Sequence, residues 1–170
     1  MLYYATLSTP LGDMLALAQD HALCGLWFEG QKYFPGQKEE WMPDPGHPLF
    51  EELRVRLSAY FDGRRQSFDL PISPEGTVFQ SQVWKLLLAI PPGQTRSYGA
   101  LAFELAELRG GVKPSAQAVG GAVGHNPISI LIPCHRVIGS DGSLTGYAGG
   151  LARKASLLAL EKFGSLPSPG

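Results

Sequence analysis

The residues best suited to chemistry lie in the run Pro133-Cys134-His135-Arg136-Val137, which follows an apolar stretch at residues 128–132. An isolated free cysteine is most often a small buried hydrophobe, and that structural interpretation applies to Cys134 as well. However, a histidine and an arginine follow this thiol, and a glycine-rich segment comes next at residues 139–150. Such surroundings lower the pKa of a thiol and admit a substrate, so the pattern favours a nucleophilic cysteine. Because neighbouring side chains often point to opposite sides, a water that connects His135 to Cys134 is an alternative to a direct contact.

A zinc site is the main alternative use of these side chains. Zinc requires about four ligands, commonly in pairs that are about two to five residues apart. His21-x-x-Cys24 is one acceptable pair, and the other histidines and cysteines form no second pair: His47, His125, Cys134 and His135. The sequence therefore predicts no metal site. Cys24 lies among apolar residues of an expected strand and is predicted to be structural.

Composition restricts the class of protein. The chain has 170 residues, of which 44% are hydrophobic and 17% are charged, so it has a core and is not disordered. Its two cysteines cannot form a disulfide framework, its apolar runs are too short to span a bilayer, and its N-terminus lacks a secretory pattern. We therefore expect a soluble, intracellular protein that does not contact a membrane.

Charge is divided unevenly along the chain. Residues 1–76 carry a net charge of −5, from six basic and eleven acidic side chains, whereas residues 77–170 carry +4, from eight and four. A mildly basic second half suits a polyanion such as nucleic acid, although ordinary scatter of surface charge is the better explanation when charge alone is considered.

The first half is typical of a small β-sheet domain with one helix. Strands are expected at residues 2–8, 13–18 and 22–28 as an antiparallel meander, followed by a loop over residues 30–47. Leucine and phenylalanine recur every four residues between 48 and 61, which predicts an amphipathic helix that ends at Asp62-Gly63. A further short strand is expected at residues 68–70 and a linker at 71–76, so the first domain is assigned to residues 1–75.

The second half, residues 76–170, is predicted to be a mainly helical domain. Thr77-x-x-Gln80 is a capping box for a first helix, which Pro91-Pro92-Gly93 ends. Ser97 caps a second helix, and a third is expected over residues 115–123 with four positions facing inward: Ala116, Val119, Gly120 and Val123. The second and third helices fit a helix-turn-helix, and a last helix is expected at residues 151–163.

With these elements in place, the chain resembles the O6-alkylguanine-DNA alkyltransferase family. The resemblance rests on the run at residues 132–137, on Asn126-Pro127, on Gly76-Thr77-x-Phe79-Gln80 and on Gly146-Tyr147-x-Gly149-Gly150, and it covers nearly all of residues 76–163 in order. The first 75 residues match weakly, mainly through the turn at residues 9–12. The resemblance implies an α+β fold, with a ribonuclease-H-like first domain and a helix-turn-helix in the second.

The resemblance also implies a reaction and the residues that perform it. Members transfer an alkyl group from guanine O6 to a cysteine, here Cys134, with Glu161 holding His135, which removes the thiol proton through a water. Asn126 braces the turn around the site. Tyr98 donates to N3 of the guanine, the backbone N–H of Ala148 faces O6, and the carbonyl of Val137 accepts from the exocyclic amine. The substrate contacts expected in this way are Tyr98, Val137, Tyr147, Ala148, Gly149 and Lys154.

A thioether has no acyl carbon for water to attack, so each molecule is expected to act once, without a cofactor. The expected partner is double-stranded DNA that contains alkylated guanine, bound by a monomer in the cytoplasm at the nucleoid, or in the nucleus if the source is eukaryotic. Whether O4-alkylthymine also reacts stays open. The damaged base must be flipped out of the duplex. The expected DNA contacts are Thr95, Ser97, Ala116, Gln117, Ala118, Gly120, Gly121, Gly124 and Arg136.

The chain departs from the family pattern at Gln117, where members commonly carry an arginine that fills the gap left by the flipped base. The zinc-binding positions of some members are not matched either.

Three other functions stay open: a lesion sensor without a reactive cysteine, a cysteine hydrolase that turns over, and a helix-turn-helix transcription factor. Cys134 argues against the first, the lack of a separate cysteine-then-histidine arrangement against the second, and Cys134-His135 beside a buried run against the third.

Overall fold

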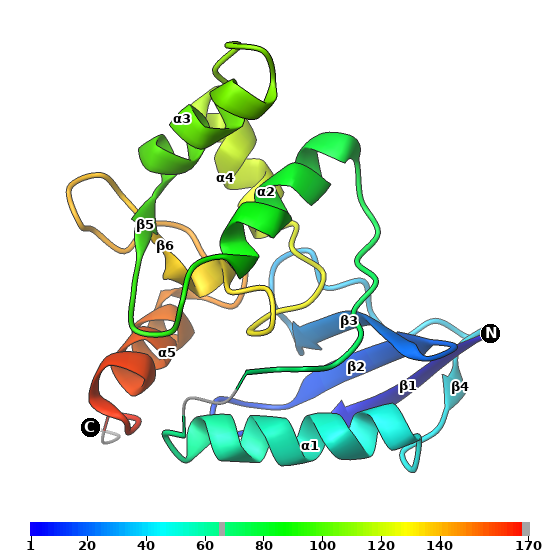
Figure 1. Cartoon of the computed structure of the whole chain (residues 1–170). Helices are drawn as coiled ribbons and strands as arrows, with labels where there is room; N and C mark the ends of the chain where they lie inside the picture. Colours follow the sequence, from blue (N-terminus) through cyan, green and yellow to red (C-terminus); the bar gives the residue numbers. More distant parts are fainter. Residues whose placement is uncertain (65–66, 168–170) are drawn as a thin grey trace.

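The first part of the chain forms a four-stranded sheet in the order β3–β2–β1–β4 (Figure 1). The computed structural model describes residues 1–64 and 67–167. Strands β1 (Leu2–Leu7), β2 (Met14–Gln19) and β3 (Ala22–Phe28) pair antiparallel, as the alternation of the sequence predicts. Strand β4 (Met42–Pro43) pairs parallel with β1 and lies inside the segment predicted to be a loop. The prediction of a purely antiparallel sheet is therefore wrong at this edge.

Helix α1 (Pro48–Phe61) covers one face of the sheet (Figure 1) and has the predicted bounds. Proline starts the helix and Gly63, with φ +85°, follows its end. The strand predicted at residues 68–70 is not present. Backbone pairing occurs instead at Ile72, which forms an isolated bridge with Leu23, while Phe68 and Leu70 only pack against the core.

Over residues 67–167, the second part contains four α-helices: α2 (Val78–Leu88), α3 (Tyr98–Leu108), α4 (Ala116–Gly124) and α5 (Leu151–Phe163). The capping box of α2 and the Ser97 cap of α3 are formed as predicted, and the Ser115 hydroxyl caps α4. The inward face of α4 consists of Val119, Ala122 and Val123, whereas Ala116 is exposed and Gly120 is only half-buried, which corrects two of the four inward positions. A two-stranded parallel pair, β5 (Arg96–Ser97) with β6 (Val137–Ile138), was not predicted.

One hydrophobic core joins the two parts. It includes Phe28 and Phe50 from the first part and Trp84, Ile128 and Leu157 from the second. The end of β3 also pairs with the segment that precedes Cys134, because the Leu26 N–H donates to the Pro127 carbonyl at 2.8 Å and the Ser129 N–H donates to the Leu26 carbonyl at 2.9 Å. The sheet thus supports the turn that carries the cysteine. Over residues 1–64 and 67–167, no helix has the length and apolar character needed to cross a membrane.

Candidate active site

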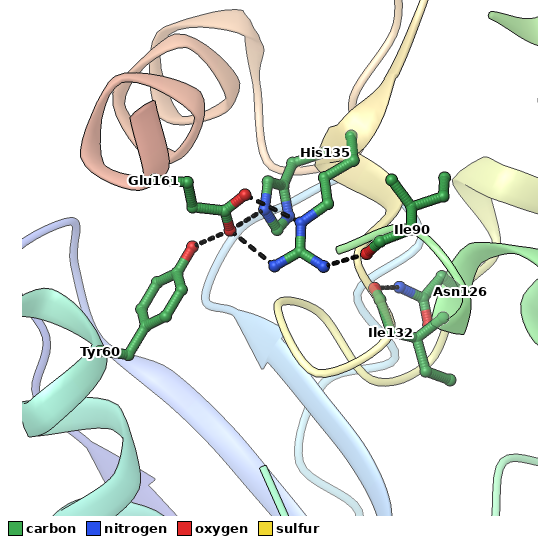
Figure 2. A network of polar contacts seen from close by, with 7 residues as sticks. Tyr60, Ile90, Asn126, Ile132, His135 and Glu161 are labelled. Atoms are coloured by element: carbon green, nitrogen blue, oxygen red, sulfur yellow. Dashed lines mark hydrogen bonds and ion pairs between the residues drawn. The ribbon is translucent and has the colours of Figure 1, made fainter. Parts of the chain in front are cut away.

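A tight turn holds Cys134 in place. Cys134 begins a short 3-10 helix, η1 (Cys134–Arg136), and Ile130 just before it adopts φ +72°, which is unfavourable for a β-branched residue. The buried side chain of Asn126 closes the turn: its amide donates to the Ile132 carbonyl at 2.7 Å (Figure 2). Its oxygen accepts from the Ile128 N–H at 3.0 Å. These bonds give Asn126 the bracing geometry that the resemblance implies.

A buried carboxylate, Glu161 of α5, lies at the centre of a network of polar side chains (Figure 2). It accepts hydrogen bonds from His135 Nε2 at 2.6 Å and from Arg136 Nε and Nη2 at 2.8 and 2.9 Å. The hydroxyl of Tyr60, from α1, donates to the same carboxylate at 2.6 Å. Arg136 also donates to the Ile90 carbonyl at 2.6 Å. The network therefore connects the first part of the chain to the cysteine turn.

The network fixes the protonation state of His135. Burial alone would raise the pKa of Glu161, but hydrogen bonds from His135 and Arg136 outweigh it and hold that pKa well below its usual range. Burial lowers the pKa of His135 despite the Glu161 carboxylate, so the imidazole is neutral. Because Nε2 donates to the ionised carboxylate, the lone pair lies on Nδ1, which is buried and has no hydrogen-bond partner within residues 1–64 and 67–167. Nδ1 is therefore the nitrogen that can accept a proton.

Cys134 is a protonated thiol at rest. It is only 5% exposed, and burial raises its pKa, while the Asn126 side chain and the charge of Lys154 act in the opposite direction. Lys154 is itself buried, which lowers its pKa to about 8. Its ammonium donates to the Val137 carbonyl and, at 3.0 and 3.1 Å, to the carbonyls of Thr145 and Gly146. Lys154 thus holds the glycine-rich loop to the cysteine turn and places a positive charge near the sulfur.

A cavity of about 730 Å³ opens onto Cys134. Its walls come from α4, from the start of α3, from the glycine-rich loop and from Lys32 and Tyr33 after β3. The residues expected at the site that line the cavity are Tyr98, Ala116, Gln117, Gly120, Gly124, Cys134, Tyr147 and Ala148. The Tyr98 hydroxyl donates to the Thr145 carbonyl at 3.0 Å. Burial raises its pKa, and the negative charge of Cys134 raises it further when that thiol ionises, so the hydroxyl stays a donor.

Three expected substrate contacts support the cavity but do not line it. Val137 accepts from Lys154, and Lys154 is buried. Gly149 is also buried, and a side chain there would collide with the Tyr147 ring, since an added Cβ would lie 2.6 Å from it. These residues shape the loop around the site, and direct contact with a substrate stays a prediction for each.

The expected DNA contacts that do not line the cavity fall into two groups. Thr95, Ala118 and Gly121 are exposed, and the Ser97 hydroxyl caps α3, so contact with DNA stays a prediction for these four. Arg136, in contrast, is 7% exposed and committed to Glu161 and Ile90, so its predicted contact with DNA is wrong. The prediction failed because the 3-10 turn directs this side chain inward.

Tyr60, Lys32 and Tyr33 were not predicted, because no local pattern places the first half of the chain beside the cysteine.

Comparison with known proteins identifies the family. The family model for the 6-O-methylguanine DNA methyltransferase DNA-binding domain matches residues 78–163, and that for the ribonuclease-like domain of the same proteins matches residues 2–74. The chain belongs to the 6-O-methylguanine DNA methyltransferase family. It is 46% identical to the methylated-DNA–protein-cysteine methyltransferase of Mycobacterium bovis, over 95% of this chain and 93% of that protein. For the enzyme of the same name from Haemophilus influenzae the identity is 42%, over 95% and 87%.

A solved structure agrees with this membership. Mycobacterium tuberculosis OGT in complex with DNA superposes with a TM-score of 0.84 at 44% identity, covering 96% of this chain and 95% of that one. The predicted α+β fold and the family resemblance are confirmed. The protein is a DNA-repair methyltransferase that acts by alkyl transfer to protein cysteine. Within residues 1–64 and 67–167, no three histidine, cysteine or acidic side chains are grouped to hold a metal ion.

Proposed function

We propose that this methyltransferase moves one alkyl group from O6 of guanine in DNA to Sγ of Cys134, once per molecule. The observation that carries the proposal is the position of Cys134 between a cavity of about 730 Å³ and a neutral histidine that Glu161 holds. A cavity of this size accommodates a purine with a small alkyl group. Behind it, Nδ1 of His135 is a base to which no described residue of the chain forms a hydrogen bond.

The reaction starts with removal of the thiol proton. His135 Nδ1 accepts it through a water, and the ionised Glu161 stabilises the imidazolium that results. The thiolate then attacks the alkyl carbon in line with the C–O6 bond, so the S–C bond forms as the C–O6 bond breaks. The departing guanine takes the electron pair and recovers one proton, which balances the one lost by Cys134. Tyr98 assists by exchanging its bond to Thr145 for one to N3 of the base.

The base reaches the cavity by leaving the duplex. Cys134 is too enclosed to meet a stacked base, so the alkylated nucleotide rotates out into the pocket. Glycines at positions 120, 121 and 124 keep the exposed side of α4 thin, which allows a DNA backbone to approach closely. Gln117 lines the cavity mouth and takes the place of the departed base.

The test is a titration with excess duplex oligonucleotide that carries one O6-methylguanine. Repaired DNA is expected to reach a plateau at about one equivalent of protein, because a thioether offers no acyl carbon for hydrolysis. Intact-protein and peptide mass spectrometry are expected to show one added methyl group, on Cys134. Cys134→Ala removes the reaction, and Cys24→Ala is the matched control that keeps it. Product formation beyond one equivalent would contradict the proposal.

Two finer parts of the proposal have their own measurements. The same titration with O4-methylthymine shows whether the cavity accepts a pyrimidine, and O6-alkyl groups of increasing length show its size limit. We propose a monomer as the active species. Sedimentation at increasing protein concentration checks this, and a mass that doubles would exclude it.

A further inference from the structure

The segment after β3 forms an unexpected part of the cavity wall. Residues 31–33 belong to the first part of the chain, yet Lys32 and Tyr33 line the same cavity as Cys134. The Lys32 N–H donates to the Ala148 carbonyl of the glycine-rich loop at 2.9 Å. The Tyr33 ring stacks on His125, next to the end of α4, with 3.8 Å between ring centroids and 25° between planes. The segment therefore connects both walls of the cavity at its mouth.

The segment is held firmly in this position. Gln31 is buried, and its side-chain oxygen accepts from the Phe28 N–H at 2.9 Å. The Phe34 N–H donates to the Gln31 carbonyl at 3.1 Å, which closes a turn around Tyr33. Tyr33 has φ +63°, a backbone conformation that is unfavourable for a bulky residue and persists only where the surroundings impose it. The turn consequently presents Lys32 and Tyr33 to the mouth in one fixed arrangement.

The exposed side chains of this segment are Lys32, which carries a positive charge, and Tyr33. Lys32 is exposed, and its ammonium lies 5.1 Å from the centroid of the Tyr33 ring, which restrains a side chain that would otherwise be mobile. Tyr33 is 49% exposed although it stacks on His125. An ammonium held at the rim of a nucleotide-sized cavity is suited to bind a phosphate of the strand whose base enters the cavity.

We propose that Lys32 binds a DNA phosphate beside the flipped nucleotide, with Tyr33 as the residue that positions it. This inference rests on the proposed function, because it assigns part of the DNA interface to the first part of the chain. It places the contact at the strand backbone and not at the base. Lys32 and Tyr33 are therefore needed for DNA and dispensable for the chemistry at Cys134.

The test compares DNA with a substrate that has no phosphate. Lys32→Gln keeps the backbone bond to Ala148 and removes only the charge. Tyr33→Asn removes the ring, and asparagine tolerates a positive φ. Binding of each variant to a duplex is measured by fluorescence anisotropy between about 50 and 200 mM salt. Single-turnover alkyl transfer is measured with that duplex carrying O6-methylguanine and with the free base O6-benzylguanine, whose benzylic carbon is activated toward displacement.

Lys32→Gln is expected to weaken DNA binding several-fold at low salt and to reduce the slope of log K against log[salt] by about 0.9. Tyr33→Asn is expected to give a smaller loss, and both variants should react with the free base at the wild-type rate. Lys162→Gln, which removes an exposed charge in the last turn of α5, is the control and should leave binding unchanged.

Three results would decide against the inference or its basis. Unchanged DNA binding and salt slope in Lys32→Gln would overturn the phosphate contact while leaving the proposed function intact. A slower reaction of Lys32→Gln with the free base would place the side chain at the base and would also overturn it. If the wild-type protein transferred no alkyl group from either substrate, the proposed function itself would fail.

Discussion

Cys134 separates two regions that are built differently. Behind it, Glu161 accepts hydrogen bonds from His135, Arg136 and Tyr60, and all of these side chains are buried. In front of it, α4 and the glycine-rich loop present glycine, alanine and exposed polar groups to the cavity. In the proposed mechanism, fixed and enclosed charges support proton transfer, whereas small and exposed residues give access to DNA. Changes behind the cysteine should affect every substrate, whereas changes on the exposed side of α4 should affect only DNA.

The largest effect is expected from Glu161→Gln. This substitution leaves the Arg136 guanidinium buried without its carboxylate, which typically costs about 3–5 kcal/mol in the free energy of unfolding. It also removes the negative charge that stabilises the His135 imidazolium in the proposed mechanism, so alkyl transfer should slow with DNA and with a free base alike. Urea unfolding at pH 7 measures the first effect and single-turnover kinetics the second. Glu52→Gln, which breaks the exposed pair with Arg56, is the control and should cost at most about 1 kcal/mol.

The wild type and Glu161→Gln should also differ in how their stability depends on pH. The pKa of Glu161 is lower in the folded state than its ordinary value of 4.5, so the unfolded state binds its proton more readily. The stability that Glu161 provides is therefore complete above pH 4.5 and is lost as the pH falls through the lower folded value. The difference in unfolding free energy between wild type and Glu161→Gln should shrink over that acidic range. A difference that grows on acidification would refute the assignment.

A smaller effect is expected when Cys134 becomes alkylated. The added methyl group enters a close-packed turn that Asn126 and Ile130 hold rigid, and overpacking of this kind costs about 1–3 kcal/mol. The melting temperature should therefore fall after reaction, and should fall further with longer alkyl groups. Cys134→Ala treated with the same DNA and then separated from it provides the baseline. A higher melting temperature for the alkylated protein would contradict this prediction, because it would show that the turn accommodates the added group without overpacking.

The smallest effect is expected at Gln117, in front of the cysteine. Flipping costs a few kcal/mol in a paired duplex and much less in a single strand. Gln117→Arg adds charge and bulk, so it should speed repair of a duplex more than repair of a single strand and should steepen the salt dependence. Gln117→Ala should slow duplex repair selectively. Single-turnover rates on the two forms of one oligonucleotide check this, and equal effects on both would remove Gln117 from the flipping step.

Much of the fold follows from local patterns in the sequence. Helix α1 and helix α5 have the predicted bounds because each has a clear apolar period and a glycine stop at its end. The capping box at Thr77 likewise marks the start of α2. Strand β4 escaped prediction because two residues are too few to show alternation, and its pairing with β1 depends on contacts distant in the sequence.

The site was predictable only in part. Cys134 and His135 stand out because their chemistry and their spacing are local. Arg136 was assigned to DNA because a basic residue next to a reactive thiol gives no indication of which way it points, and the 3-10 turn directs it to Glu161. Tyr60 lies 101 residues from Glu161 in the chain, and no periodicity encodes that contact. Such pairings arise from how the two parts of the chain pack on each other.

The enclosure of Cys134 also protects the protein during the time before it meets DNA. Burial keeps the sulfur protonated, and oxidants and stray electrophiles in the cell attack thiolates in preference to thiols. If each molecule reacts only once, as we propose, any such encounter would consume it. Burial of Cys134 therefore extends the lifetime of protein that has not yet met DNA. The reactive cysteine is then consumed by alkylated DNA and not by oxidants or other electrophiles.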